Sequence, residues 1–98
     1  MNKGDVLIRL KAHEKALKAR GVAHAALFGS LARDEQREDS DIDIMIELDP
    51  AARVTTFDYV DIKAYIAGLF HGPVDVVNRE GLKPFVRPRA AADAIYAF

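Results

Sequence analysis

The alternation of aspartate and isoleucine at residues 41–44 constrains the fold more than any other stretch of this sequence. Side chains of a β-strand point alternately to opposite faces, so the pattern over residues 41–48 predicts a strand with one apolar and one acidic face. The face that carries Ile42 and Ile44 is expected in the core. The other face would hold Asp41 and Asp43 close together, where their like charges repel, so stability alone does not explain the pair.

Helices and strands alternate along the chain, which predicts one α/β domain over residues 1–98, with helices and a small sheet. The apolar spacing predicts helices over residues 5–20, 30–35 and 57–70, and strands over residues 23–28, 41–48 and 74–78. Residues 36–40 are interpreted as a polar loop. Residues 79–98 are expected to be helical for part of their length, and Pro84 and Pro88 limit where that helix begins.

Several side chains receive structural rather than functional assignments. His13 is expected to face solvent on the first helix, and Ser40 to shape the loop that leads into the acidic strand. Glu38 and Asp39 are expected in a solvated loop and not as a ligand pair. Four aromatic residues are expected to pack on the helices: Tyr59, Tyr65, Phe70 and Phe85.

Composition narrows the classes of function. There is no cysteine, which excludes disulfides, thiolate zinc sites and cysteine nucleophiles. The net charge of −1 does not favour direct binding of nucleic acid, because contacts to its phosphates require a basic surface. No apolar run reaches the length of a membrane span or of a signal-peptide core, so a cytoplasmic protein with no membrane contact is expected.

Asp75 lies in the third predicted strand and faces away from its flanking valines. If that strand lies beside the second one, Asp75 joins Asp41 and Asp43 on one patch. Carboxylate oxygens suit Mg²⁺, which would relieve the repulsion, and such clusters are typical of phosphoryl and nucleotidyl transfer sites. The alternative is a solvated face of an edge strand, with Asp75 on the polar side of a half-buried strand.

Gly29 and Ser30 directly follow the first predicted strand. A glycine allows a sharp turn and a close approach of the backbone to a ligand. If Ser30 opens a helix, the N–H groups of its first turn form an anion site, to which the serine hydroxyl adds a donor. Together with a metal on the second strand, this describes a site for a nucleoside triphosphate. Ser30 could instead be a helix cap, and Arg33 could support the phosphates or face solvent.

These residues resemble a known signature. Gly29-Ser30, followed by Ala32-Arg33 and then by Ser40-Asp41-Ile42-Asp43, matches the pattern G-S-x-A-R … S-D-x-D of the DNA polymerase β-like nucleotidyltransferase superfamily. The short chain and the later Val74-Asp75-Val76-Val77 make it similar to the minimal nucleotidyltransferases, the branch of the MntA-type antitoxins. The resemblance covers essentially the whole chain, and the signature is more specific than a lone glycine-rich loop.

The resemblance implies a nucleotidyltransferase fold, a small mixed β-sheet with helices packed against it. It implies that Asp41 and Asp43 bind one or two Mg²⁺ ions and that Asp75 is the third catalytic and metal-binding acid. Gly29-Ser30 would hold the triphosphate of ATP, with Arg33 nearby. All three acids are present, so the motif shows no sign of an inactive copy.

The implied reaction is transfer of AMP from ATP to a hydroxyl, with pyrophosphate leaving. In the minimal branch the acceptor is often a tyrosine of a HEPN-domain toxin, so the chain is expected to be an antitoxin that forms a hetero-oligomer with that partner. A second domain that grips a small acceptor is not expected in ninety-eight residues, which also favours a protein acceptor. The alternatives are transfer to a small molecule or an RNA end, and an antitoxin that neutralises its partner by binding alone.

Overall fold

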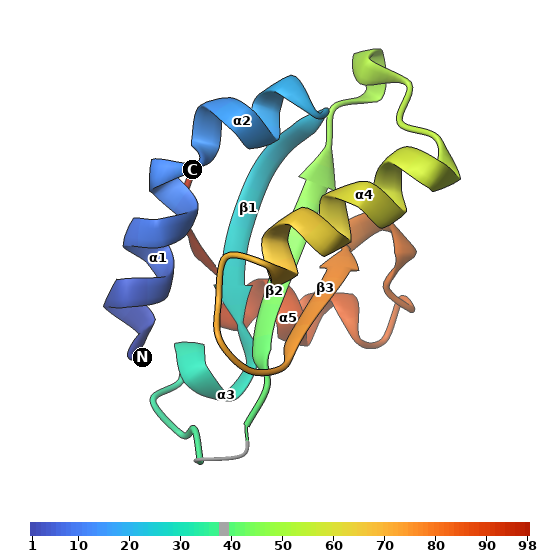
Figure 1. The fold of residues 1–98 in the computed structure, drawn as a ribbon. Helices are drawn as coiled ribbons and strands as arrows, with labels where there is room; N and C mark the ends of the chain where they lie inside the picture. The colour runs from blue at the N-terminus through green and yellow to red at the C-terminus, as the bar shows by residue number, and fades with distance from the viewer. Residues whose placement is uncertain (38–39) are drawn as a thin grey trace.

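In the part of the chain that the structure describes, the sheet is mixed and contains four strands in the order β3-β2-β1-β4. The computed structural model describes residues 1–37 and 40–98 (Figure 1). The strands are β1 (Val22–Phe28), β2 (Ile42–Leu48), β3 (Val74–Asn78) and β4 (Ile95–Tyr96). β1 runs antiparallel to β2 and to β4, whereas β2 and β3 run parallel. The predicted fold class is therefore confirmed.

The main core lies on one face of the sheet. It is formed with α1 (Lys3–Ala12), α2 (Glu14–Ala19) and α4 (Thr56–Ala67), and Figure 1 shows α4 crossing in front of the strands. The isoleucines of β2 are buried there, which confirms the predicted apolar face: Ile42, Ile44 and Ile46. A slip of one residue in pairing would turn all of them to the opposite face, so their burial specifies the register of β2.

The acidic face of β2 is covered over part of its length by α5 (Arg87–Asp93), which lies behind the sheet in Figure 1. Ala90 of α5 packs there against Ala26 of β1 and Met45 of β2. Met45 is therefore buried although it shares its face with the aspartates. Asp41 and Asp43 lie beyond this small cluster, toward the end of the sheet where β1 stops and β2 starts.

The first helix differs from its prediction as one element over residues 5–20, because a turn at His13 divides it into α1 and α2. His13 does not face solvent as predicted. Its Nδ1 lies 2.7 Å from the hydroxyl of Tyr65 on α4, and the two rings meet edge to face. Leu10 and Leu17, on either side of the turn, are both buried in the main core. The break in the helix thus coincides with a contact between His13 and Tyr65, which are distant in the sequence. The local periodicity of residues 5–20 could not indicate that contact.

The strands predicted over residues 23–28, 41–48 and 74–78 are confirmed to within one residue at each end. The helix predicted over residues 30–35 is the single turn α3 (Gly29–Ala32). α4 starts after the N-cap Thr55 and ends at Ala67, short of the predicted residue 70. Two short 3-10 helices, η1 (Pro50–Ala52) and η2 (Arg79–Gly81), follow β2 and β3.

The C-terminal residues contain both a confirmed and a missed element. α5 is the predicted partial helix, and Pro88 lies in its first turn. β4 was not predicted, and it pairs with β1 after α5. Phe85 was predicted to pack on a helix, but it is 73% exposed in the segment before α5. The other aromatic residues contribute to the main core as predicted: Tyr59, Tyr65 and Phe70.

The loop before β2 is described in part. Ser40 shapes it as predicted, because its hydroxyl accepts a hydrogen bond of 2.8 Å from the backbone N–H of Arg37. The prediction for Glu38 and Asp39 lies outside the described residues. No helix within residues 1–37 and 40–98 combines the length and the apolar character needed to cross a membrane.

Candidate active site

Asp43 and Asp75 are direct neighbours on two parallel strands. β2 and β3 pair in register with Asp43 beside Asp75, and side chains at such positions point to the same face of a sheet. Asp41 lies just before β2, two positions ahead of Asp43. Asp43 is half-buried, whereas Asp41 and Asp75 are exposed. The structure thus brings the three predicted carboxylates to one end of the sheet.

Gly29 lies at the end of β1, against Asp43. Phe28 is the register partner of Asp43, and Gly29 follows it with a φ of 76°, in the left-handed region that favours glycine. A Cβ added to Gly29 would overlap Oδ2 of Asp43. The position therefore requires glycine both for its backbone conformation and for the space that the carboxylate occupies.

Like charges surround Asp43. Burial raises the pKa of Asp43 above its ordinary value, the charges of Asp75 and Asp41 raise it further, and Arg33 lowers it. Each of these neighbours acts by disfavouring or favouring the charged carboxylate. A perturbed carboxyl group within a cluster of acids is a candidate functional group, because the fold leaves its charge uncompensated.

Ser30 lies within α3, which is one turn long and begins at Gly29. Phe28 occupies the N-cap position, and no side chain caps this helix, so the alternative assignment of Ser30 as a simple cap does not apply. The first turn of a helix leaves its N–H groups without acceptors inside the helix. These groups and the Ser30 hydroxyl lie directly after the glycine that contacts Asp43.

Arg33 connects α3 to α5. Its Nη1 lies 2.5 Å from Oδ2 of Asp93, and its Nε lies 3.0 Å from Oε2 of Glu35. Hydrogen bonds to Glu35 and Asp93 raise the pKa of Arg33, so its charge is held firmly. Neither sequence-based assignment described this ion pair with α5, although the positive charge still acts on Asp43.

Several pockets lie near the carboxylates. One, of about 450 Å³, is lined by Asp41 itself, together with Arg37 and His71 among other residues. Another lies between the end of β1, α3 and α5, and its volume is about 540 Å³; we call it the β1-side pocket. Its lining includes Phe28, Gly29, Arg33, Phe85, Arg89 and Asp93. Gly29 belongs both to this pocket and to the contact with Asp43, so the pocket lies next to the carboxylate site.

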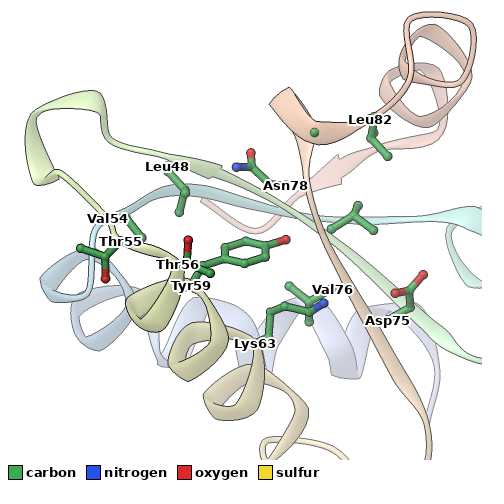
Figure 2. Close-up of a pocket in the computed structure, with 12 residues that line it drawn as sticks. Leu48, Val54, Thr55, Thr56, Tyr59, Lys63, Asp75, Val76, Asn78 and Leu82 are labelled. Atoms are coloured by element: carbon green, nitrogen blue, oxygen red, sulfur yellow. The ribbon is translucent and has the colours of Figure 1, made fainter.

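A further pocket, the β3-side pocket, lies between α4 and β3 and has a volume of about 510 Å³. Figure 2 shows Tyr59 and Lys63 of α4 reaching toward β3, with Asp75 at one end of the pocket. Burial raises the pKa of Tyr59, and the charge of Asp75 adds to this effect. β3 is an edge strand, so the pocket lies at the rim of the sheet.

Within residues 1–37 and 40–98, no three histidine or acidic side chains lie close enough together to form a metal site on their own. Asp41, Asp43 and Asp75, although they lie at one end of the sheet, do not form such a site by themselves. Mg²⁺ is usually bound through one or two carboxylates together with water and substrate phosphates.

From the sequence, Arg89 could contact a triphosphate or an acidic partner, although a surface role is favoured, and Phe85 is expected only to pack on a helix; both residues line the β1-side pocket. Residues 84–89 interleave an aromatic residue with two arginines, a composition that is found at surfaces that bind phosphorylated ligands. The placement of this segment beside Gly29 depends on the path of α5 across the sheet, which the local sequence does not report.

The model of the nucleotidyltransferase domain family matches residues 10–97 of this chain. The chain is a member of the nucleotidyltransferase family. A solved minimal nucleotidyltransferase has the same fold, with a TM-score of 0.69 and 32% identity over 97% of this chain and 95% of that one. The resemblance seen in the sequence signature, including its minimal branch, is therefore confirmed, and so is the enzyme class.

Two relatives of this nucleotidyltransferase carry names that specify a protein acceptor. The Thermococcus cleftensis protein "Protein adenylyltransferase MntA" is 32% identical over 88 residues, which are 89% of this chain and 87% of that protein. The Methanocaldococcus jannaschii protein "Putative protein adenylyltransferase MJ1379" is 37% identical over 89 residues, which are 89% of each chain. Both matches extend over nearly the whole of the proteins compared.

A further likeness concerns the fold alone. The structure of a tri-AMPylated Shewanella oneidensis HEPN toxin in complex with an MNT antitoxin contains a chain that matches with a TM-score of 0.61. The match covers 90% of this nucleotidyltransferase and 68% of that chain, at 15% identity.

Proposed function

We propose that this nucleotidyltransferase transfers AMP from ATP to a tyrosine hydroxyl of a HEPN-domain toxin and so acts as the antitoxin of that toxin. The observation that carries the proposal is the register pair of Asp43 and Asp75, with Gly29 against Asp43. The name of the Thermococcus cleftensis relative supports a protein as acceptor. The likeness to a chain from the solved structure of an AMPylated HEPN toxin with an MNT antitoxin supports the choice of partner.

Asp41 and Asp43, with Asp75 as the third acid, are the residues that would hold one or two Mg²⁺ ions. The donor set fits the ion, because carboxylate oxygens are hard ligands and because burial, together with the charges of Asp75 and Asp41, raises the pKa of Asp43. When bound, Mg²⁺ supplies positive charge that stabilises the phosphate oxygens during an in-line displacement.

The residues after β1 bind the phosphates in this proposal. Gly29 has no side chain, so phosphate oxygens can approach the backbone beside Asp43. The N–H groups of α3 and the hydroxyl of Ser30 donate hydrogen bonds to those oxygens. Arg33, which is held by Asp93, adds positive charge on the same side of the site.

Asp75 acts on the acceptor. It is exposed and lies at one end of the β3-side pocket, where a side chain of a partner protein can enter. The acceptor oxygen forms a bond to the α-phosphorus while the bond from that phosphorus to the oxygen that bridges to the β-phosphate breaks. The acceptor proton passes to the carboxylate of Asp75, pyrophosphate leaves, and AMP remains on the acceptor.

A protein acceptor suits the shape of this site. The β3-side pocket lies at the rim of the sheet, so a tyrosine on the surface of a partner reaches Asp75 without a second domain to hold it. An RNA acceptor is less compatible with a net charge of −1, because phosphate contacts require a basic surface.

The mass of the partner tests the proposal. A HEPN-domain protein encoded beside this chain would be co-expressed with the unaltered protein and, separately, with Asp43→Asn. We expect the partner to gain the mass of one or more AMP groups on tyrosine with the unaltered protein and none with the variant. An unmodified partner that is still bound and neutralised in both cases contradicts the proposal and favours an antitoxin that acts by binding.

A further inference from the structure

The β1-side pocket has features that the proposed reaction does not yet use. Its volume of about 540 Å³ is within the range of small-molecule sites. Phe28 in its wall is the register partner of Asp43, and Gly29 in its wall contacts that carboxylate. A ligand whose phosphates lie at Gly29 therefore has room to extend from the carboxylates into this pocket.

Phe85 presents an open aromatic ring to this pocket. It lines the pocket and is 73% exposed. The Nζ of Lys83 lies 6.0 Å from the centroid of this ring, a contact that contributes little at an exposed position. A nucleobase stacks on such a ring whatever its identity, because every base has a π-face.

One positive charge at the rim of the pocket is available to an anionic ligand. Arg33 forms ion pairs with both Asp93 and Glu35, so its charge is compensated within the protein. Arg89 is exposed and forms no ion pair with any described residue, so its charge is available to a phosphate group.

The β3-side pocket does not offer an equivalent platform. Its aromatic residue, Tyr59, is half-buried against the main core. The pocket lined by Asp41 has no phenylalanine or tyrosine among its lining residues. Of these three pockets, the β1-side pocket is thus the one lined by an exposed phenylalanine ring.

We propose that the β1-side pocket binds the base and ribose of the nucleoside triphosphate, with Phe85 stacked on the base and Arg89 directed to the phosphates. The inference rests on the proposed function, which places the phosphates at Gly29. It assigns the β3-side pocket to the acceptor. Donor and acceptor then approach Asp43 and Asp75 from opposite sides, so the acceptor does not have to displace the base.

Calorimetric titration of the protein with Mg²⁺ and α,β-methylene-ATP, an analogue that cannot transfer AMP, tests this assignment. Phe85→Ala should weaken binding by about tenfold, which lies within the range for base–aromatic stacking. Phe85→Trp should retain it. Phe57→Ala is the matched control, because Phe57 on α4 is 84% exposed and lies outside the pocket.

Binding of inorganic tripolyphosphate distinguishes the contribution of the phosphates to affinity from that of the base. This ligand has no base, so Phe85→Ala should bind it as the unaltered protein does. Arg89→Gln should weaken the binding of both ligands and reduce the dependence of affinity on salt. Equal affinity of Phe85→Ala and the unaltered protein for the ATP analogue would overturn the inference, as would an equal loss in Phe57→Ala.

The proposed function and this inference can fail separately. If the analogue binds in a manner that depends on Phe85 but no AMP reaches a partner, the pocket assignment stands and the transfer reaction fails. If AMP is transferred and Phe85→Ala leaves the affinity for the analogue unchanged, the reaction stands and the pocket assignment fails.

Discussion

The carboxylate of Asp43 occupies the space in which a side chain on Gly29 would begin. The two residues come from different elements, Asp43 from β2 and Gly29 from the turn that ends β1. Their contact joins the glycine-serine part of the motif to its acidic part. The antiparallel pairing of β1 with β2, and not the number of residues between the two parts, brings them into contact.

Replacement of Gly29 by alanine should abolish AMP transfer, because the new methyl group displaces the Asp43 carboxylate. Gly72→Ala is the matched control. Gly72 also has a positive φ, of 89°, but a Cβ there meets no atom within 4 Å. Both variants should lose about 1 kcal/mol or more of stability from backbone strain, and only Gly29→Ala should be inactive. Urea unfolding and AMP incorporation measure the two effects, and full activity in Gly29→Ala contradicts the account.

Asp43→Asn should make the metal-free protein more stable at neutral pH while it abolishes transfer. The pKa of Asp43 in the folded protein is raised above its ordinary value of 3.8 by burial and by Asp75 and Asp41. A raised pKa means that the contribution of this group to stability is present below 3.8 and is lost as pH rises through the folded value. The gain from asparagine should be on the order of 0.5–1 kcal/mol.

Urea unfolding in the presence of a chelator checks this prediction at neutral pH and at a pH below 3.8. The gain should disappear at the lower pH, where the carboxyl group is protonated in both states. Asp61→Asn serves as the control, since Asp61 is exposed on α4, and it should give no such gain. Lower stability of Asp43→Asn at neutral pH would show that the fold compensates the Asp43 charge.

Thr55→Ala should destabilise α4 by about 1 kcal/mol, because Thr55 caps this helix. Its hydroxyl accepts a hydrogen bond of 3.1 Å from the backbone N–H of Asp58, whose side chain accepts one of 3.0 Å from the backbone N–H of Thr55. Thr56, at the next position, makes neither contact, so Thr56→Ala should lower the free energy of unfolding by less. Thermal unfolding of the two variants decides the point, and equal losses would exclude capping as the cause.

The same cap has a pH dependence of opposite sign to that of Asp43. Hydrogen bonds to Thr55 lower the pKa of Asp58 below its ordinary value of 3.8. Its contribution to stability is therefore present above 3.8 and is lost as pH falls through the folded pKa. The stability difference between Thr55→Ala and the unaltered protein should shrink in that acidic range.

Tyr65→Phe should cost about 1 kcal/mol, the net value of a partly buried hydrogen bond. The hydroxyl of Tyr65 lies 2.7 Å from Nδ1 of His13 at the turn between α1 and α2. Tyr96→Phe is a useful comparison, because the Tyr96 hydroxyl lies 2.7 Å from Glu47 but at an exposed site. Urea midpoints should fall further for Tyr65→Phe, and the reverse order would argue against a structural role of His13.

The acidic strand and its apolar face were predictable from the sequence because the signal is local. Alternation of aspartate with isoleucine specifies both the strand and the face that is buried, and Ile44 and Ile46 are indeed buried. β3 was predictable for the same reason. The convergence of Asp75 with Asp43 was a conditional prediction, because alternation does not say that β2 and β3 are parallel neighbours in register.

The missed features all depend on contacts between distant parts of the chain. β4 has two residues and exists through its pairing with β1, so no local pattern could indicate it. The turn at His13 accompanies a contact with Tyr65. Met45 is buried on the acidic face because α5 crosses there, and the same crossing places Phe85 and Arg89 beside Gly29.

The most direct measurement uses ATP labelled either on the α-phosphate or on the γ-phosphate, incubated with Mg²⁺, this protein and its HEPN-domain partner. We expect protein-bound label from the α-phosphate alone, carried by the partner, and no label with Asp43→Asn. Label from the γ-phosphate, or no label on either protein while the complex still forms and the toxin is still neutralised, would contradict AMP transfer as the function of this site.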